Sequence, residues 1–264
     1  MENETSGSGP GPGNTIIKKE AGALSSNLFE ADANKGSQNI EQDDLALPFL
    51  KVLGHLSPEI NKQHAKYIEG ASPGMIINTV TKELFKGEEG IDVLPVFYKR
   101  QYIEWQDRGA SMGAPVNIYE ASDTLPKSQR SKDNKDRLAN GNYLETTASH
   151  FVILLGKTPT TALISMKATQ LKVSRTWNSL MMGIKMQGKN GLFTPPTYSH
   201  IYSLKAVQMS NDKGTWFGWD VSLKGPVKDK SIYEVAKSFS DRVNKGEVQA
   251  KHESSVEPKK EINL

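Results

Sequence analysis

Residues 149–186 read SHFVILLGKTPTTALISMKATQLKVSRTWNSLMMGIKM, and a change of hydrophobic period within this stretch decides the fold. Two apolar runs, Ser149–Leu155 and Thr161–Met166, predict a pair of strands, because turn-forming residues occupy positions 156–159 between them. Over Thr169–Met186 the apolar side chains recur at helical spacing, which predicts an amphipathic helix. A strand pair followed by a helix therefore forms the centre of the expected fold.

Three further strands surround this centre. The run IDVLPVFYKRQYIEWQ (Ile91–Gln106) is rich in β-branched and aromatic residues, and Pro95 within it indicates an edge position or a bulge. Ser199–Ser210 and Thr215–Lys224 also predict strands, and a hairpin turn signal separates them at 211–214. The helix is thus expected to lead into an antiparallel strand pair.

Two shorter elements complete the expected domain. Met75–Val80 (MIINTV) predicts an early strand. A C-terminal helix is expected to begin at a capping box formed by Ser231 and Glu234, and to end at Gly246.

The order of these elements favours a mainly β, α+β fold. An oligonucleotide/oligosaccharide-binding (OB) barrel has five strands with a helix after the third, and the predicted helix takes that place. We therefore expect an OB-like five-stranded barrel with one helix between strands 3 and 4, a C-terminal helix and disordered tails. A generic α+β sheet domain with a helix on one face is the alternative.

Composition divides the chain into a single domain, residues 45–246, and two tails. The net charge of +3 conceals an uneven distribution, because residues 1–44 carry eight acidic and three basic side chains. These residues are rich in Gly, Ser, Asn and Pro, so we expect a disordered acidic N-terminal tail. Residues 107–145 are polar and predict a long loop or insertion, and residues 247–264 predict a flexible C-terminal tail.

The sequence gives little sign of enzymatic chemistry. The absence of cysteine removes thiolate catalysis and Cys-based metal sites, and the five histidines lack the spacing of a zinc helix. The GKT at 156–158 resembles a phosphate-binding loop, but Phe151 replaces the glycine that such a loop needs. We expect no catalytic residues, no metal and no cofactor.

With no signal sequence and no membrane span expected, a cytoplasmic location is favoured.

The strongest compositional signal is the segment Thr146–Asn211, which contains no Asp or Glu over 66 residues. Its basic side chains are Lys157, Lys167, Lys172, Arg175, Lys185, Lys189 and Lys205. Because an acidic group near a phosphate repels it, the absence of acids is typical of a polyanion-binding surface. The alternative is that these cations only keep one face soluble.

Aromatic side chains accompany the cations. In the strand at 91–106, Tyr98, Arg100 and Tyr102 fall on one face by period-2 alternation. Bases of single-stranded nucleic acid stack on such rings at about 1–3 kcal/mol each, while cations follow the backbone. Other aromatic residues are assigned to the core, namely Phe97, Trp177, Phe217 and Trp219.

The candidate nucleic-acid-binding residues combine both kinds of side chain. They are Tyr98, Arg100, Tyr102, Lys167, Lys172, Arg175, Lys185, Lys189, Phe193, Tyr198, Tyr202, Lys205 and Trp216. A second basic cluster lies in the expected loop and consists of Lys127, Arg130, Lys132, Lys135 and Arg137.

Several stretches resemble a group of tailed-bacteriophage early proteins, which are generally taken to be single-stranded DNA-binding proteins or to be of unknown function. The stretches are PFLKVLGHLSPEI (48–60), PGMIINTVT (73–81), IDVLPVFYKRQYIEW (91–105), WNSLMMGIKMQGKNGLFTPPTYSHIY (177–202) and NDKGTWFGW (211–219). The resemblance covers about residues 45–245 and implies an OB-like nucleic-acid-binding domain. Phage proteins of this kind often have an acidic C-terminal tail that recruits replication proteins, whereas here the acidic tail is N-terminal.

The leading hypothesis is a sequence-independent single-stranded DNA-binding protein, not an enzyme, that acts in phage DNA replication or recombination. Its expected partners are single-stranded DNA and phage replication or recombination proteins, with a homo-oligomer left open. The loop at 107–145 is expected to close over the strand.

The alternative is a protein-interaction module, either a virion component or an inhibitor of a host protein, whose basic face binds an acidic partner. A nuclease is disfavoured because the basic segment lacks a carboxylate cluster.

Overall fold

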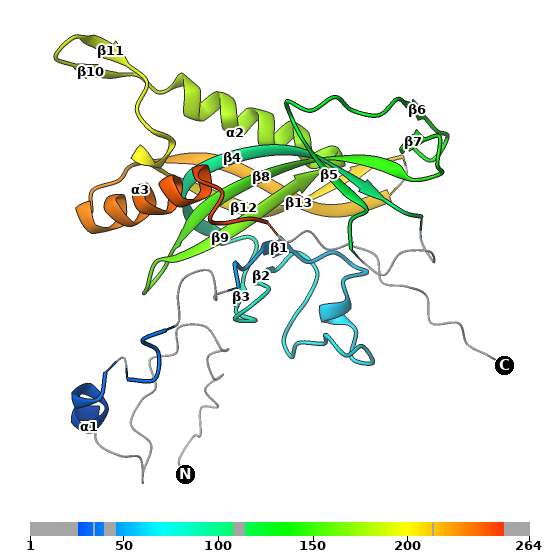
Figure 1. Cartoon of the computed structure of the whole chain (residues 1–264). Coiled ribbons are helices and arrows are strands. Elements are labelled where there is room, and N and C mark those ends of the chain that lie inside the picture. Colours follow the sequence, from blue (N-terminus) through cyan, green and yellow to red (C-terminus); the bar gives the residue numbers. More distant parts are fainter. Residues whose placement is uncertain (1–25, 34, 40–45, 108–113, 213, 251–264) are drawn as a thin grey trace, which may run out of the picture.

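The computed structural model describes residues 26–33, 35–39, 46–107, 114–212 and 214–250. These residues form a mainly β structure, in which a large antiparallel sheet is curled into a half-barrel with helices against it (Figure 1). None of the helices in these ranges is long and apolar enough to cross a membrane.

Most of the two expected tails lies outside the described residues. Within the N-terminal tail the structure has a short helix, α1 (Ser26–Ala31), and the disorder expected of this tail stays a prediction. Of the C-terminal tail, only residues 247–250 are described.

The large sheet has eight strands, and the five longest occupy the predicted positions. The strands are β4 (Ile91–Trp105), β5 (Asn117–Glu120), β6 (Ser128–Arg130), β7 (Asp136–Leu138), β8 (Tyr143–Leu155), β9 (Thr160–Lys167), β12 (His200–Asn211) and β13 (Gly214–Pro226). Their order is β13-β12-β4-β8-β7-β6, with β5 paired to β4 and β9 paired to β8. The predicted count of five strands is therefore too low for this sheet.

β4 is the central strand, and it contains a bulge at its proline. It pairs with β8 along most of its length and with β12 at its start. The register shifts between Pro95 and Phe97, because proline has no N–H to contribute to the ladder. Beyond the bulge the register is regular, so Tyr98, Arg100 and Tyr102 share one face as predicted.

The concave side of the half-barrel holds the main hydrophobic cluster. Helix α2 (Leu171–Gly183) lies between β9 and β12 in the chain, as predicted, and covers this side (Figure 1). It inserts Trp177, which is fully buried, among side chains of β4, β8, β9, β12 and β13. Trp177 and Trp219 are core residues as expected.

A small sheet closes the half-barrel on the side away from α2 (Figure 1). Its strands are β1 (Leu50–Val52), β2 (Ile76–Asn78) and β3 (Leu84–Phe85), of which β3 lies where only a connection was expected. The chain before β1 bridges to β9, because Leu163 donates its N–H to the Pro48 carbonyl at 2.8 Å. Leu50 and Ile76 then join the main cluster.

Helix α3 (Lys230–Asn244) packs on the opposite face of the sheet and forms a second cluster. Its buried side is formed by Ala236, Phe239 and Val243. The helix begins one residue earlier than predicted and its cap is Asp229, whose carboxylate accepts the Ser231 N–H at 2.7 Å. The proposed capping box at Ser231 is therefore wrong.

Two regions predicted to be irregular contain hairpins. The expected loop at 107–145 includes β5, β6 and β7, so it is in large part an extension of the sheet. Residues 188–191, just beyond the expected helix, are the turn of a hairpin formed by β10 (Met186–Gly188) and β11 (Gly191–Phe193). Three short 3-10 helices complete the described elements, namely η2 (Pro58–Ile60), η3 (Ala168–Gln170) and η4 (Thr197–Ser199).

Candidate nucleic-acid interface

A buried histidine joins helix α2 to the face of β4 that carries the predicted aromatic side chains. His150 on β8 stacks on Trp177 of α2, with ring centroids 4.3 Å apart, and lies 5.0 Å from the Tyr98 ring. Its Nε2 shares a 2.8 Å hydrogen bond with the Ser174 hydroxyl. Burial lowers the pKa of His150 to about 3, so the ring stays neutral and acts as a packing element.

The next residues on this face of β4 reach solvent. Arg100 is exposed, and its guanidinium lies 5.9 Å from the centre of the half-buried Tyr102 ring. Tyr98, in contrast, packs against the main cluster, so it contributes mainly to the core. The accessible part of the predicted row is therefore Arg100 with Tyr102.

Helix α2 presents two cations on its solvent side. Lys172 and Arg175 are both exposed, and neither forms an ion pair with any residue in the described part of the chain. Ser174 points to His150 on β8, so Arg175 follows directly after the residue that fixes the helix to the sheet. These cations are free to meet an anion.

The start of α2 is fixed to the free edge of β13. The Gln170 side chain accepts the Trp219 N–H at 2.8 Å, and its amide donates to the Met209 sulfur at 3.5 Å. Gly218 makes this approach feasible, because a Cβ there would lie 2.2 Å from the Gln170 amide nitrogen. The Gln170 side chain thus accepts a backbone N–H of β13, the edge strand of the sheet.

A shallow pocket of about 260 Å³ lies between this helix entrance and the tip of the β12–β13 hairpin. Its lining residues are Thr169, Asn211, Gly214, Thr215 and Trp216. The Trp216 ring is half-buried, and its indole N–H has no partner among the described residues. Arg100, Tyr102, Lys172, Arg175 and Trp216 are named here the α2 surface.

Two predicted binding residues pack against other aromatic rings, Tyr202 in the interior and Tyr198 half-buried. Tyr202 is fully buried beside Trp177, with ring centroids 5.9 Å apart, and burial raises its pKa to about 12. Tyr198 packs on Tyr233 of α3 at 5.2 Å, and burial is the main cause of its raised pKa. The candidate binding residue Tyr202 is not at the surface, because the β12 register directs it to the concave side opposite Val93.

Two predicted lysines have acidic neighbours in space. Lys167 forms an ion pair of 2.6 Å with Glu145, one residue before the acid-free segment, and its ammonium lies 5.5 Å from the Trp105 ring centre. Lys205 lies directly across from Asp220 in the β12–β13 ladder. The acid-free stretch of sequence is therefore not everywhere an acid-free surface.

The remaining predicted members of the segment lie on the β10–β11 hairpin. Lys185, Lys189 and Phe193 are all exposed there. The hairpin projects from the end of α2, away from the β5–β7 region (Figure 1). These residues are consequently separate from the α2 surface.

The basic cluster of the 107–145 region is largely neutralised by acids. Arg130 pairs with Asp136 at 3.0 Å, and Lys135 pairs with Asp107 at 3.0 Å. Arg137 bonds Asp107 at 2.5 Å and also Asp133 at 2.8 Å, and its donation is the main reason that the pKa of Asp107 is lowered. Exposed cations without a described ion pair in this cluster are Lys127 and Lys132.

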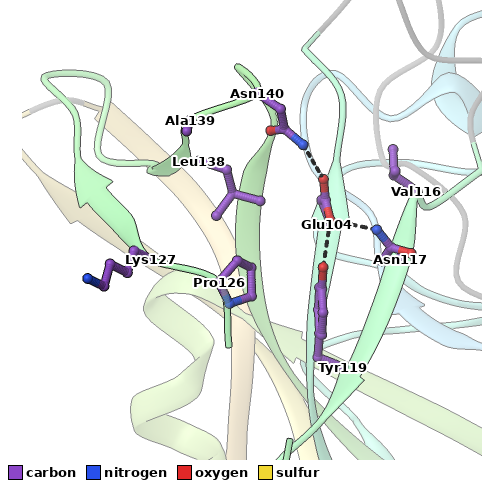
Figure 2. A pocket seen from close by; sticks show the side chains of 9 residues that line it. All are labelled: Glu104, Val116, Asn117, Tyr119, Pro126, Lys127, Leu138, Ala139 and Asn140. Carbon is purple, nitrogen blue, oxygen red and sulfur yellow. Dashed lines mark hydrogen bonds between the residues drawn. The ribbon is translucent and has the colours of Figure 1, made fainter. Parts of the chain in front are cut away.

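A buried carboxylate fixes this region to β4. Glu104 is 2 % exposed, and its Oε2 accepts from Asn117 at 2.8 Å and from the Tyr119 hydroxyl at 2.9 Å (Figure 2). Its Oε1 accepts from Asn140 at 3.0 Å and from Asn142 at 2.5 Å. Burial raises the pKa of Glu104, but these four hydrogen bonds outweigh that effect and bring it to about 2.

Glu104 also lines a pocket of about 450 Å³, whose wall includes Pro126, Lys127 and Leu138 (Figure 2). A carboxylate offers about four lone-pair sites, and the four donors occupy them all. Glu104 is therefore a structural anchor with no capacity left for a ligand. Within the described ranges, no group of three or more His, Asp or Glu side chains could hold a metal ion.

The sequence did not single out His150, Ser174, Gln170 or Glu104, which build and orient the surface. Each acts through a partner that is distant along the chain, so no local pattern pointed to it. Lys172, Arg175 and Arg100 are predicted cations that are exposed and form no ion pair within the described residues.

The fold and the α2 surface together define a mainly β protein with exposed aromatic and cationic side chains beside a curled sheet. A family model of Pam3 phage gp34-like proteins matches residues 18–249, and the chain belongs to this family. No curated protein and no solved structure matched the chain. The phage origin expected from the sequence is confirmed, whereas the likeness to single-stranded DNA-binding proteins stays a prediction.

Proposed function

We propose that the protein is a sequence-independent single-stranded DNA-binding protein that acts in phage DNA replication or recombination in the host cytoplasm. The observation that carries this proposal is the α2 surface: Arg100 lies 5.9 Å from the centre of the partly exposed Tyr102 ring, and Lys172 and Arg175 form no ion pair within the described residues. Lysine and arginine neutralise phosphates, and unpaired bases stack on aromatic rings. A surface with both groups fits the binding of a single strand.

The connectivity of the five long strands supports an OB-like arrangement. Taken in chain order, the first strand (β4) pairs with the second (β8) and the fourth (β12), and the fifth (β13) pairs with the fourth. Helix α2 follows the third strand, β9. Oligonucleotides bind OB folds at strands 2–3 and at the loops after strands 1 and 4. Here those loops are the insertion at 106–142 and the β12–β13 tip beside Trp216.

A titration of the whole protein with labelled oligo-dT and with a duplex of equal length tests the proposal. Fluorescence anisotropy is expected to give tighter binding to the single strand, because duplex bases are not free to stack. The logarithm of the affinity is expected to fall with the logarithm of salt concentration, by about 0.7 per phosphate contacted. Absence of binding at low salt, or equal affinity for both forms, contradicts the proposal.

The double variant Arg100→Ala/Tyr102→Ala tests the location of the site. Removal of one cation and one ring is expected to weaken oligo-dT binding by roughly tenfold or more. Lys205→Ala is the matched control, because Lys205 is exposed but lies across from Asp220. An equal loss in both variants would mean that binding depends on overall charge and not on the α2 surface.

A further inference from the structure

The β10–β11 hairpin and the end of α2 expose apolar side chains that nothing in the described chain covers, with Met186 and Phe193 on one face of the hairpin and Leu192 on the other. Met182, Met186, Leu192 and Phe193 are 61 %, 43 %, 72 % and 45 % exposed. Among the described strands, β10 and β11 pair only with each other, so both outer edges are free. An isolated two-stranded hairpin is marginally stable in water, and exposed apolar edges tend to pair with another chain.

A second surface of this kind lies at the opposite end of the molecule, on β5 (Figure 1). Val116 and Ile118 are 43 % and 42 % exposed, and within the described residues β5 pairs only with β4. Glu120 and Asp123 adjoin this strand, with Glu120 also paired to Lys99 at 2.7 Å. The β5 surface is thus apolar with acidic neighbours.

The charges of the two surfaces are complementary. The hairpin has Lys185 and Lys189 and lies inside the segment without acids, whereas residues 114–126 contain Glu120 and Asp123 and no lysine or arginine. Contact between two hairpins would bring lysines together, and contact between two β5 surfaces would bring acids together. Because Glu120 already pairs with Lys99, the opposite charges that the hairpin against β5 joins, along with apolar side chains, are those of its lysines and of Asp123.

We propose that copies of this chain associate head to tail, with the β10–β11 hairpin of one copy docked on the β5 surface of the next. Because the two surfaces lie at opposite ends, the contact is heterologous and leaves one free surface at each end of a chain of copies. The association itself is argued from the two surfaces alone. It rests on the proposed function only for its purpose, which is the coating of a DNA strand by successive copies.

Sedimentation velocity over a range of concentrations tests the association with two variants, Leu192→Glu on the hairpin and Ile118→Lys on β5. The wild type is expected to form species larger than dimers. Each variant alone is expected to be monomeric, since it has lost one surface. An equimolar mixture is expected to form one-to-one dimers only, through the two intact surfaces. A monomeric wild type, a closed wild-type dimer, or a mixture that stays monomeric overturns the proposal.

Controls separate a docking defect from misfolding. Val235→Glu alters an equally exposed apolar side chain, 48 % exposed on α3, and is expected to leave association unchanged. Lys189→Glu is expected to weaken association at least threefold, and mixing it with Asp123→Lys is expected to restore the contact. A failure of that restoration, with both variants folded, argues against the pairing of these two surfaces.

Binding to a short oligo-dT, which holds a single copy, distinguishes this inference from the proposed function. Leu192→Glu is expected to bind it as the wild type does, and to lose only cooperative binding on long strands. If Leu192→Glu weakens short-strand binding, the hairpin belongs to the DNA site and the docking proposal is wrong. If the wild type binds no oligonucleotide but still associates in sedimentation, the proposed function fails and the docking proposal stands.

Discussion

Helix α2 and the β6–β7 hairpin are both rich in cations in the sequence, yet the fold treats their charges in opposite ways. On α2, Lys172 and Arg175 form no ion pair with the described residues. On the hairpin, Arg130 pairs with Asp136, and Arg137 pairs with two aspartates. The difference shows that a count of basic residues predicts a binding surface only when the spatial neighbours are also counted.

The geometry of each element explains the difference. Arg130 and Asp136 are direct partners across the β6–β7 ladder, so an acid six residues away becomes a neighbour. On a helix the neighbours are three and four residues away, and for Lys172 and Arg175 those positions hold no acid. The segment without acids therefore leaves the cations of α2 without an ion pair among the described residues, whereas the β6–β7 hairpin lies outside that segment and has an acid across its own ladder.

The largest expected effect is a loss of stability on removal of the Trp177 ring, which anchors α2 to the sheet. Trp177→Ala deletes a fully buried ring that stacks on His150, and is expected to lower the free energy of unfolding by about 3–5 kcal/mol. Denaturant unfolding measures the change. Leu180→Ala, at a position 37 % exposed on the same helix, is the control and is expected to cost less than about 1.5 kcal/mol. Equal losses would mean that Trp177 is not the anchor.

The second effect is a loss of stability on replacement of Glu104, the buried carboxylate that fixes the 107–145 region to β4. Glu104→Gln replaces two oxygen acceptors by one oxygen and a donor, and is expected to cost about 1.5–3 kcal/mol. The folded pKa of Glu104, about 2, lies below the ordinary 4.5, so the stabilisation is present above pH 4.5 and disappears as the pH falls towards 2. The gap in unfolding free energy between wild type and variant is therefore expected to narrow in that window. A gap that is constant with pH contradicts this role.

The sequence predicted those features that depend on local periodicity. The five long strands, the helix between β9 and β12, and the interruption at Pro95 all follow from spacing within one element. Features that depend on distant partners were missed. Tyr202 resembles an exposed strand residue until its register with Val93 is known, and the four donors to Glu104 come from 13 to 38 residues further along.

The third prediction compares the two cationic regions directly. Lys172→Ala/Arg175→Ala is expected to weaken oligo-dT binding by roughly tenfold at low salt and to reduce the salt slope by about 1.4, because two phosphate contacts are lost. Arg130→Ala/Arg137→Ala removes the same charge but is expected to change affinity by no more than about twofold, since these cations already have acidic partners. Anisotropy titrations at several salt concentrations measure both. Similar losses in the two variants would contradict the comparison.

The smallest expected effect is a gain in oligo-dT affinity. Asp136→Asn removes the acid that pairs with Arg130 at 3.0 Å, while the amide retains the size of the side chain and the β6–β7 ladder. The freed guanidinium is expected to raise oligo-dT affinity by about twofold at low salt, and the gain is expected to vanish at high salt because screening removes it. Asp241→Asn on α3 changes the net charge equally and is the control. If both variants gain equally, the effect is one of net charge, and if neither gains, the hairpin lies out of reach of the bound strand.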